Sequence, residues 1–444
     1  MKIPLKELAA GLGATVDSPV VATGWSVDTR TMEPGDVYFA LRGPNHDGHE
    51  HVAAAFEKGA CAAVVERETG GGPTIRVADT LAALQMAAGW ARARWGGGVV
   101  AITGSAGKTT TKEAVARMLS VRGTVGKTTG NFNNHVGVPL SLLRLPDDAK
   151  LGVIEIGMNH AGEIRNLAAI ARPDVAVVTN VGSAHIENFD SIEGVAAAKR
   201  ELVESLTADG VAVLNADDAR VVGFRGAHSG RVVTYGLGAE ADVRGEDVEL
   251  LADGVRFRVG AARFESPVAG RIGVSNLLAG IVVAGVYGIA AEELVEAARG
   301  FEPGKMRGAR FVRDGVLIFD DCYNANPDAM RAMVDVLRDA RAERRIAVLG
   351  EMLELGRWAE PLHREVGKYV ASQGIDVLVG IRGVARSLVD AAIEGGLPTN
   401  AALFFAEPGD AGAHLKTMAR SGDAILFKGS RGTHVERALE RYLG

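Results

Sequence analysis

Short runs of apolar residues recur along the chain, and polar or helix-forming stretches separate them. Four of these runs lie in the middle of the chain, at Val99–Thr103, Gly152–Ile156, Val175–Asn180 and Val211–Asn215. Four more lie in the last third, at Leu317–Asp321, Arg345–Gly350, Asp376–Gly380 and Asp423–Phe427. Continuous apolar runs of about four to eight residues are typical of strands buried on both faces of a parallel sheet. The pattern therefore predicts an α/β protein with two doubly wound sheets.

Other patterns divide the chain into parts. The first part, to about residue 80, alternates short strands and helices, with turn signals at Glu33–Asp36 and Gly43–Gly48. We expect an alanine-rich helix over Thr80–Trp95, a strand-rich patch over Val232–Pro267 and a joint at Phe301–Gly304. Because a chain of 444 residues is too long for a single core, we expect about three domains.

Composition and charge exclude several classes of protein. With 47% hydrophobic and 23% charged residues, the chain has the composition of an ordinary globular protein. A formal net charge of -6 and the lack of a basic tract argue against a nucleic-acid partner. The two cysteines, Cys61 and Cys322, lie far apart and lack the spacing of metal ligands, which suits a reducing compartment. Since the first residues also lack the apolar segment of a signal peptide, we expect a cytoplasmic protein.

One stretch raises the alternative of a membrane segment. Ile272–Ala291 carries no charged residue and is long enough to span a bilayer. Its glycines and the polar Ser275 and Asn276 dilute the hydrophobicity, and no second such stretch accompanies it. A buried helix of a large domain explains this pattern better than an integral membrane segment.

The segment Val100–Thr111 carries the most specific chemical signal. It combines an apolar strand, a tight turn with two glycines and the start of a helix. The glycines let backbone N–H groups surround an anion, and the helix N-terminus adds a positive dipole. We expect Lys108 to reach the β- and γ-phosphates of a nucleotide and Thr109 to hold Mg²⁺. The predicted phosphate-binding residues are Gly104, Ser105, Ala106, Gly107, Lys108, Thr109 and Thr110.

This loop differs from the common phosphate-loop pattern at one position. Ile102 stands where that pattern has glycine, so the loop has the shorter form GxxGKT. A glycine-rich turn that binds nothing is the alternative interpretation. Gly-Lys-Thr-Thr-Thr directly after an apolar strand favours nucleotide binding.

Two further polar residues lie at or after strand ends, where ligands bind to parallel sheets. Glu155 is an isolated carboxylate in an apolar run, and burying it without a cation is unfavourable. Because Mg²⁺ prefers oxygen ligands, we expect Glu155 and Thr109 to share a metal, with a structural salt bridge as the alternative. His185 follows the end of the next predicted strand, and this position favours a functional role over the structural role usual for a lone histidine.

Seven segments spread over most of the chain resemble motifs of the Mur ligase family. They are Thr103–Thr111, Gly130–Pro139, Glu155–Met158, Asn180–His185, Asp320–Pro327, Leu349–Gly356 and Lys428–Gly432. The resemblance implies three domains. These are a small N-terminal α/β domain for a UDP-sugar (1–82), a central P-loop ATPase with a mostly parallel sheet (83–304) and a C-terminal Rossmann-like domain that closes over the site (305–444).

The resemblance also implies a metal site. A lysine on a helix usually faces solvent, but Lys199 matches the lysine that Mur ligases carbamylate with CO₂. A carbamate would convert this cation into an anionic oxygen ligand. The implied metal ligands, for two Mg²⁺ ions, are Thr109, Glu155, His185 and the carbamylated Lys199, and the implied catalytic residues are Lys108, Glu155, His185, Lys199 and Arg307.

Further ligand-binding residues are implied by position within the matching motifs. For ATP they are Asn133, Asn134, Asn276, Arg307, Asp321 and Asn324. The family often has His-Asn where this chain has Ile272-Gly273, so the adenine contacts are less defined than the phosphate contacts. For the other substrates they are Asp28, Thr29, Arg30, Asp47, Gly48, His49, Lys428, Ser430 and Arg431. Turn, cap or helix-start chemistry is the alternative for these polar residues.

The resemblance implies an ATP-dependent ligase of peptidoglycan precursor synthesis, a part of cell-wall biogenesis. It is strongest to the members that join D-alanyl-D-alanine to UDP-N-acetylmuramoyl-tripeptide through an acyl-phosphate, releasing ADP and phosphate. We expect a monomer that acts on small molecules. The third residue of the tripeptide, diaminopimelate or lysine, is left open.

Three alternatives remain at this point. A ligase that adds the third residue would carry an Asp-Asn-Pro-Arg motif, which this chain lacks. A folylpolyglutamate-synthase-like ligase would share the ATP site but would not need the segment Asp47–His49. A P-loop switch protein would hydrolyse nucleotide without an amino-acid acceptor.

Overall fold

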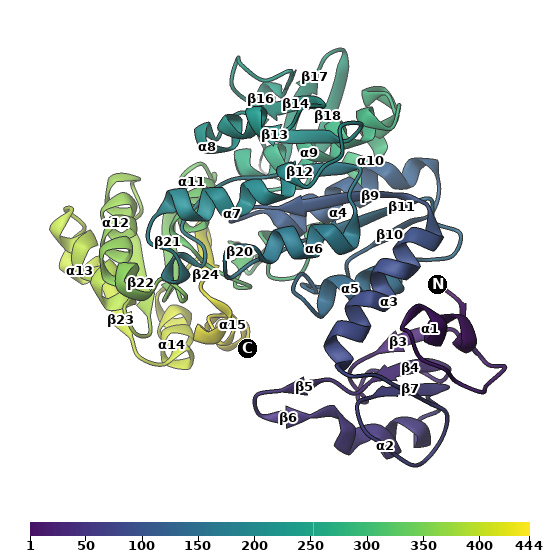
Figure 1. Ribbon diagram of the computed structural model, residues 1–444. Coiled ribbons are helices and arrows are strands. Elements are labelled where there is room, and N and C mark those ends of the chain that lie inside the picture. Colours follow the sequence, from purple (N-terminus) through teal and green to yellow (C-terminus); the bar gives the residue numbers. More distant parts are fainter. Residues whose placement is uncertain (252) are drawn as a thin grey trace.

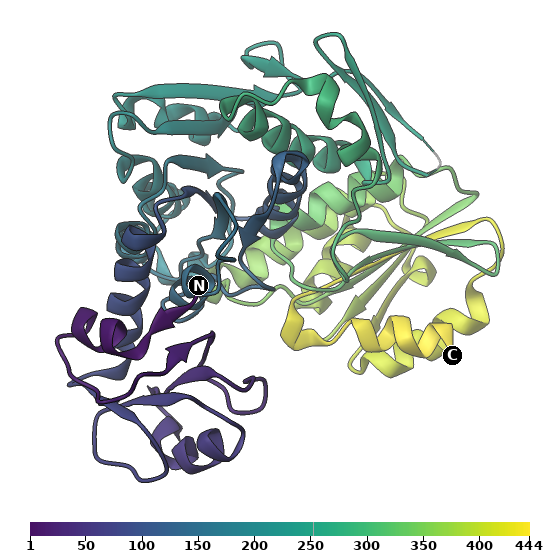
Figure 2. The same ribbon diagram turned by 90° about the vertical axis from the view of Figure 1, so that its right-hand side faces the viewer.

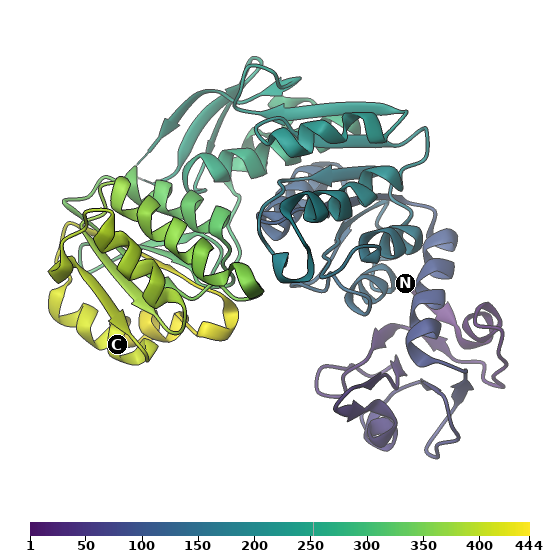
Figure 3. The same cartoon turned by 60° about the vertical axis from the view of Figure 1, so that its left-hand side comes forward.

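The protein has three units, each built on its own mainly parallel sheet, as a computed structural model shows for residues 1–251 and 253–444 (Figure 1). The N-terminal and C-terminal units both lie against the central unit and are separated from each other (Figures 2 and 3). None of the helices in the described part of the chain is both long and apolar enough to cross a bilayer.

The N-terminal unit contains a four-stranded parallel sheet in the order β3-β4-β7-β8, with a short hairpin and a two-stranded ribbon beside it. Its strands are β1 (Ile3–Pro4), β2 (Val21–Ala22), β3 (Gly24–Ser26), β4 (Asp36–Phe39), β5 (Arg42–Gly43), β6 (His46–Asp47), β7 (Ala62–Val65) and β8 (Thr74–Arg76). Its helices are α1 (Leu5–Gly11) and α2 (Val52–Glu57). The expected alternation of short strands and helices is confirmed.

A single helix, α3 (Thr80–Trp95), joins this unit to the central one, with the bounds that the sequence predicts. Asp79 begins it by accepting hydrogen bonds from two backbone N–H groups, and Gly96 ends it with a φ of 69°. Near its end, Arg92 Nε donates to the carbonyl oxygen of Ala171 in the central unit at 2.9 Å. The helix is therefore anchored to the central unit.

The central unit contains a seven-stranded sheet in the order β10-β11-β9-β12-β13-β14-β15, and all its neighbouring strands are parallel. The strands are β9 (Gly98–Thr103), β10 (Val125–Lys127), β11 (Leu151–Glu155), β12 (Val175–Val178), β13 (Val211–Asn215), β14 (Arg231–Gly236) and β15 (Val243–Arg244). The helices are α4 (Lys108–Leu119), α5 (Gly137–Leu143), α6 (Glu163–Ala171), α7 (Ile192–Glu204), α8 (Ala219–Val222), α9 (Gly270–Val286) and α10 (Val295–Arg299). The four predicted strands are present with small shifts at their ends.

The apolar stretch near residue 280 forms α9, which is buried against α4 and a small sheet. The interpretation as a buried helix is confirmed. The small sheet is antiparallel and consists of β16 (Glu246–Leu250), β17 (Val255–Val259) and β18 (Ala262–Ser266), inside the predicted strand-rich patch.

The C-terminal unit contains a six-stranded sheet in the order β19-β20-β24-β21-β22-β23, in which β19 alone is antiparallel to its neighbour. The strands are β19 (Ala309–Arg313), β20 (Val316–Asp321), β21 (Arg344–Gly350), β22 (Val377–Ile381), β23 (Ala402–Phe405) and β24 (Asp423–Lys428). The helices are α11 (Pro327–Arg338), α12 (Ala359–Ser372), α13 (Ala385–Glu394), α14 (Pro408–Met418) and α15 (Glu436–Leu443). The predicted second doubly wound unit is confirmed.

Candidate active site

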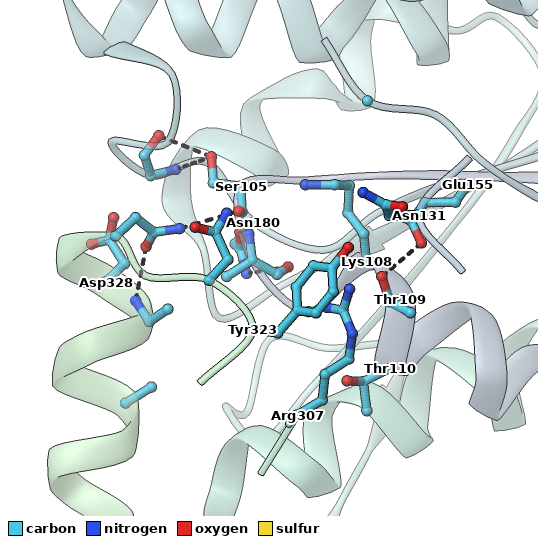
Figure 4. Close-up of a pocket in the computed structure, with 18 of the residues that line it drawn as sticks. Ser105, Lys108, Thr109, Thr110, Asn131, Glu155, Asn180, Arg307, Tyr323 and Asp328 are labelled. Carbon is cyan, nitrogen blue, oxygen red and sulfur yellow. Dashed lines mark hydrogen bonds between the residues drawn. The ribbon is translucent and has the colours of Figure 1, made fainter. Parts of the chain in front are cut away.

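A cavity of about 920 Å³ lies where loops of the central and C-terminal units meet. It is lined by the turn after β9, by strand ends of the central sheet and by loops after β20, β21 and β24 (Figure 4). Strand carboxyl ends from two parallel sheets therefore face one space, the usual place for a ligand in α/β folds.

The turn between β9 and α4 requires its two glycines. Gly104 has a φ of 153°, and a Cβ there would lie 1.9 Å from Thr179 Oγ1. Gly107 has a φ of 77°, and a Cβ there would lie 2.8 Å from Asn276 Oδ1. Any other residue at either position would meet both backbone strain and a steric clash.

The residues after β12 hold this turn in shape. Ala106 N donates to Asn180 Oδ1 at 2.8 Å, and the carbonyl oxygen of Ala106 accepts from Thr179 Oγ1 at 2.7 Å and from Asn180 Nδ2 at 3.1 Å. Within the described chain, the N–H groups of residues 107–110 have no hydrogen-bond acceptor. These free donors at the start of α4 form a site for an anion.

Lys108 is folded back onto this turn. Its Nζ donates to the carbonyl oxygen of Gly104 at 2.7 Å. Burial lowers the pKa of Lys108, the charge of Glu155 opposes this shift, and the charge of Arg307 adds to it. Two cations thus face the cavity beside the free N–H groups, and a polyanion such as a phosphate chain would neutralise them.

Glu155, at the end of β11, is 1% exposed and accepts two hydrogen bonds. Thr109 Oγ1 donates to its Oε2 at 2.8 Å, and Asn133 Nδ2 donates to its Oε1 at 2.8 Å. The structure thus brings together Thr109 and Glu155, the predicted pair, and places Asn133 beside them. Lys112 Nζ lies 4.0 Å from Glu155 Oε2. This lysine supplies a positive charge beside the buried carboxylate even without a metal.

The oxygen atoms of Thr109 and Glu155 have the chemistry of Mg²⁺ ligands. In residues 1–251 and 253–444, no three His, Cys, Asp or Glu side chains gather closely enough to hold a metal. A metal at Glu155 would therefore need further oxygen atoms from a bound phosphate, which is the way in which Mg²⁺ is usually held.

His185 lies on the loop after β12, opposite a residue of the C-terminal unit. Its Nδ1 lies 2.7 Å from Glu354 Oε2. This hydrogen bond lowers the pKa of Glu354. Both residues have a positive φ, 60° for His185 and 62° for Glu354. Non-glycine residues in this conformation often mark functional sites.

Lys199, on α7, is 1% exposed and does not line the cavity. Burial and the nearby charge of Lys108 lower its pKa well below the usual 10.5, and no carboxylate of the described chain offsets them. Burial of a lysine without an anionic partner favours the neutral amine over the ammonium.

The polar residues of the C-terminal unit lie at the ends of β20 and β24. The Lys428 ammonium is bonded to the Asp321 carboxylate, and it also donates to the carbonyl oxygen of Asn324 at 2.9 Å. The guanidinium of Arg307 lies over the ring of Tyr323, 3.8 Å from its centre (Figure 4). All five of these side chains line the cavity.

Four predicted residues have hydrogen-bond or ion-pair partners within the protein. Asn134 Oδ1 accepts from Gly137 N at 2.9 Å near the start of α5, and Asn276 Oδ1 accepts from Thr111 Oγ1 at 3.1 Å. Ser430 Oγ accepts from Leu353 N at 2.9 Å. Arg431 Nη1 pairs with Glu436 at 3.1 Å on the surface. Each of these four residues also lines the cavity. Their contacts within the protein are therefore compatible with contacts to a ligand as well.

The predicted residues of the N-terminal unit do not line the cavity. Arg30 pairs with Asp28 at 2.7 Å and lowers the pKa of Asp28 to about 2. Thr29 lies between them in the sequence. Asp28 and Arg30 lie near the surface, where an anion can reach the guanidinium of Arg30.

The second predicted segment of this unit is held by hydrogen bonds within the unit. His49 Nδ1 lies 2.6 Å from Asp47 Oδ1, and His49 Nε2 accepts from Glu66 N at 2.9 Å. Gly48 packs so closely that a Cβ would lie 2.7 Å from the carbonyl oxygen of Leu41. Since both ring nitrogens are engaged, His49 holds Asp47 in place and has no free nitrogen for a ligand.

The sequence interpretation assigned no role to six residues that shape the site: Lys112, Thr179, Asn180, Asn326, Asp328 and Glu354. Polar residues directly after a buried strand were the available signal for Thr179 and Asn180. The contacts of the last three join segments far apart in the sequence, so no local signal could reveal them.

Models of known families match all three units. The Mur ligase family, catalytic domain, matches residues 22–86; the Mur ligase middle domain matches residues 102–284; and the Mur ligase, glutamate ligase domain, matches residues 306–431.

Individual proteins match nearly the whole chain. The UDP-N-acetylmuramoyl-tripeptide--D-alanyl-D-alanine ligase of Bacillus subtilis is 34% identical over 99% of this chain and 98% of its own length. The ligase of the same name from Synechocystis is 36% identical over 94% of this chain and 91% of its own.

Solved structures agree with these matches. A crystal structure of MurF from Acinetobacter baumannii superimposes with a TM-score of 0.91 at 30% identity, covering 100% of this chain and 99% of the other. MurF from Thermotoga maritima in complex with ADP has a TM-score of 0.83 at 28% identity, covering 94% and 96%. The chain therefore belongs to the Mur ligase family.

Proposed function

We propose that this protein is an ATP-dependent ligase that joins D-alanyl-D-alanine to UDP-N-acetylmuramoyl-tripeptide in peptidoglycan precursor synthesis. One observation carries the proposal: the free N–H groups of residues 107–110 and the ammonium of Lys108 share a cavity with Glu155 and with the polar groups of the C-terminal unit. The names of the full-length relatives indicate the substrates.

The site suits phosphoryl transfer to a carboxylate. In this reaction the terminal carboxylate of the tripeptide attacks the γ-phosphorus of ATP, the bond from that phosphorus to ADP breaks, and the products are an acyl-phosphate and ADP. The amine of D-alanyl-D-alanine then attacks the acyl carbon, and phosphate departs. Lys108, Arg307 and the N–H groups of the turn would stabilise the negative charge that gathers on the phosphate oxygens.

Thr109 and Glu155 would hold Mg²⁺ together with phosphate oxygens. When bound, the ion would neutralise charge on the transferred phosphate. His185 would contribute to a second metal position. His185 is paired with Glu354 in this structure, so a metal bound through the same nitrogen would replace Glu354 as the partner of His185.

Lys199 would complete this second position as a carbamate. Only a neutral amine reacts with CO₂, and the lowered pKa of Lys199 favours that form. The product carries a negative charge, which would supply the oxygen ligands that the unmodified chain lacks at this place.

The three units would divide the substrates among them, with boundaries after residues 82 and 304. Arg30 on the N-terminal unit would bind the diphosphate of the UDP-sugar. Asp321 and Asn324 would contact the ribose of ATP, and Arg431 would bind the carboxylate of the dipeptide. Lys428 is engaged by Asp321, so its direct role is to orient that carboxylate.

The test is release of inorganic phosphate by the purified full-length protein with ATP and Mg²⁺. Release is expected only when UDP-N-acetylmuramoyl-tripeptide and D-alanyl-D-alanine are both present. Sustained release with either alone would favour a nucleotide switch, and release with a folate and glutamate would favour a folylpolyglutamate-type ligase. Parallel reactions with the diaminopimelate and lysine tripeptides would identify the third residue.

A further inference from the structure

The beginning of α11, in the C-terminal unit, contacts two loops of the central unit. Asn326 caps this helix, because its Oδ1 accepts from Ala329 N at 2.9 Å. The other end of the same amide, Nδ2, donates to the carbonyl oxygen of Ser105 at 3.2 Å, and the residue is 6% exposed. Two positions further on, Asp328 Oδ2 accepts from Ser183 N at 3.1 Å.

The two loops are themselves joined through Ser105. Its Oγ donates to the carbonyl oxygen of Gly182 at 2.8 Å and accepts from Gly182 N at 2.8 Å. Asn326, Ser105, Gly182, Ser183 and Asp328 therefore form a closed ring of contacts that crosses between the units. We call these five residues the interunit ring.

The approach within the ring is close. A Cβ on Gly182 would lie 2.1 Å from Asp328 Oδ2, so only glycine allows Asp328 to reach Ser183 N. The other oxygen of Asp328 lies 3.6 Å from Arg331 Nη1 on the same helix, and this second contact keeps the carboxylate oriented.

Both loops of the ring lead into the site. Ser105 immediately precedes the residues with free N–H groups, and Ser183 lies two positions before His185. Without the C-terminal unit, the carbonyl oxygen of Ser105 and the N–H group of Ser183 would lose these partners. A contact at the start of α11 thus fixes two parts of the site that belong to the other unit.

We propose that Asn326 and Asp328 are positioning residues. When the C-terminal unit closes, they fix the position of the phosphate-binding turn relative to the loop that carries His185. Full affinity for the nucleotide then requires the closed arrangement. The consequence for catalysis, which rests on the proposed function, is that ATP is aligned for transfer only when the groups of the C-terminal unit are also in place.

The first test is a double-mutant cycle on the full-length protein, with the affinity for ADP and Mg²⁺ measured by calorimetry. Gly182→Ala is expected to weaken ADP binding at least about tenfold, because its Cβ collides with Asp328. Asp328→Ala is expected to weaken binding about three- to tenfold through loss of a charge-assisted hydrogen bond. In the Asp328→Ala background the nearest remaining atom is the Cβ at 3.3 Å, so Gly182→Ala should add less than about twofold.

An equal effect of Gly182→Ala in both backgrounds would overturn the proposal, since the two residues would then not meet in the nucleotide-bound protein. Unchanged ADP affinity in both single variants would overturn it too. Thermal unfolding of each variant shows whether it is folded.

Asn326→Ser provides a second variant in case Gly182→Ala does not fold. Serine keeps a capping oxygen for α11 and removes the amide donor to Ser105, so ADP affinity should fall about threefold or more. The matched control is Arg357→Ala, which removes a different contact between the units, the bond from Arg357 Nη2 to the carbonyl oxygen of Asp190 at 3.2 Å. An equal loss in the control would contradict a specific role of the interunit ring.

The ligase assay separates this inference from the proposed function. With the expected substrates, Asp328→Ala should lower kcat about tenfold and leave the KM of the UDP-substrate within about twofold. A raised KM with unchanged kcat would contradict positioning of the turn. If the wild-type protein catalyses no ligation, the proposed function is wrong. The double-mutant cycle on ADP affinity would still test the interunit ring.

Discussion

An ammonium group buried without an anionic partner is unfavourable, and the described residues place no carboxylate beside the buried Lys199, so its pKa is lowered. The neighbouring charge of Lys108 adds to the cost. Proteins retain such a group when its neutral form has a use, and reaction with CO₂ is the use that we propose. His49 shows the opposite case, because its buried ring has partners on both nitrogens.

Lys199→Ala is therefore expected to lower phosphate release about a hundredfold or more, since it would remove the proposed carbamate and the metal ligand that the carbamate supplies. High concentrations of acetate or propionate should restore part of the activity by placing a carboxylate in the space left by the side chain. The control is Arg200→Ala, the neighbouring residue on α7, whose guanidinium pairs with Glu204 at the surface. Normal activity of Lys199→Ala without added acid would contradict the carbamate.

At the scale of elements, the packing of α9 on α4 sets the direction of the helix that begins at the phosphate-binding turn. Gly280 on α9 lies against the backbone of Ala114 on α4, where a Cβ would be 3.1 Å from the carbonyl carbon. Gly285, five residues further along, has no atom within 4 Å of its Cβ position. Two glycines of one helix thus have opposite surroundings.

Gly280→Ala is expected to destabilise the protein by about 1–3 kcal/mol through overpacking, and to weaken ADP binding by displacing α4. Gly285→Ala is expected to stabilise it by about 0.5–1 kcal/mol, because alanine favours a helix at no steric cost. Denaturant unfolding and ADP titration of both variants check this pair. Equal changes in stability and ADP affinity for the two substitutions would show that the close contact between Gly280 and α4 does not constrain how α9 packs on α4.

At the scale of the whole molecule, the proposed function requires the UDP-substrate to extend from the N-terminal unit to the cavity. The placement of the N-terminal unit then decides whether the substrate reaches the cavity. Arg144 of the central unit fixes it by donating from Nε at 3.0 Å and from Nη2 at 2.7 Å to the carbonyl oxygen of Trp25. The Met1 ammonium adds bonds to the carbonyl oxygens of Leu143 and Leu145. Both contacts lie at the end of α5, away from the phosphate-binding turn.

Arg144→Ala is expected to raise the KM of the UDP-substrate about tenfold and to leave ADP affinity within about twofold, because it frees the N-terminal unit without touching the turn. Steady-state kinetics with the tripeptide substrate, together with ADP titration, measures both quantities. Arg76→Ala serves as the control, because Arg76 is exposed on the same unit and pairs only with the exposed Glu68. If Arg144→Ala also weakened ADP binding about tenfold, the contact would not act on the UDP-substrate alone and the prediction would be wrong.

The local parts of the site were predictable because they depend on short segments. The turn at Gly104–Gly107, the helix over Thr80–Trp95 and the carboxylate of Glu155 at a strand end all follow from neighbouring residues. The pairing of Glu155 with Thr109 was also accessible, since parallel strands end at one edge of a sheet.

Sequence by itself thus determined the α/β class, the glycine turn before α4 and the family, because hydrophobic period, glycine conformation and motif order are properties of adjacent residues. Only the tertiary structure decided that Lys199 has no counter-charge, that Glu354 faces His185, and that Asn326 and Asp328 complete a ring with Ser105. These facts depend on burial and on contacts between distant segments. Charge compensation and desolvation are set by every neighbour in space, and the linear order of residues does not specify those neighbours.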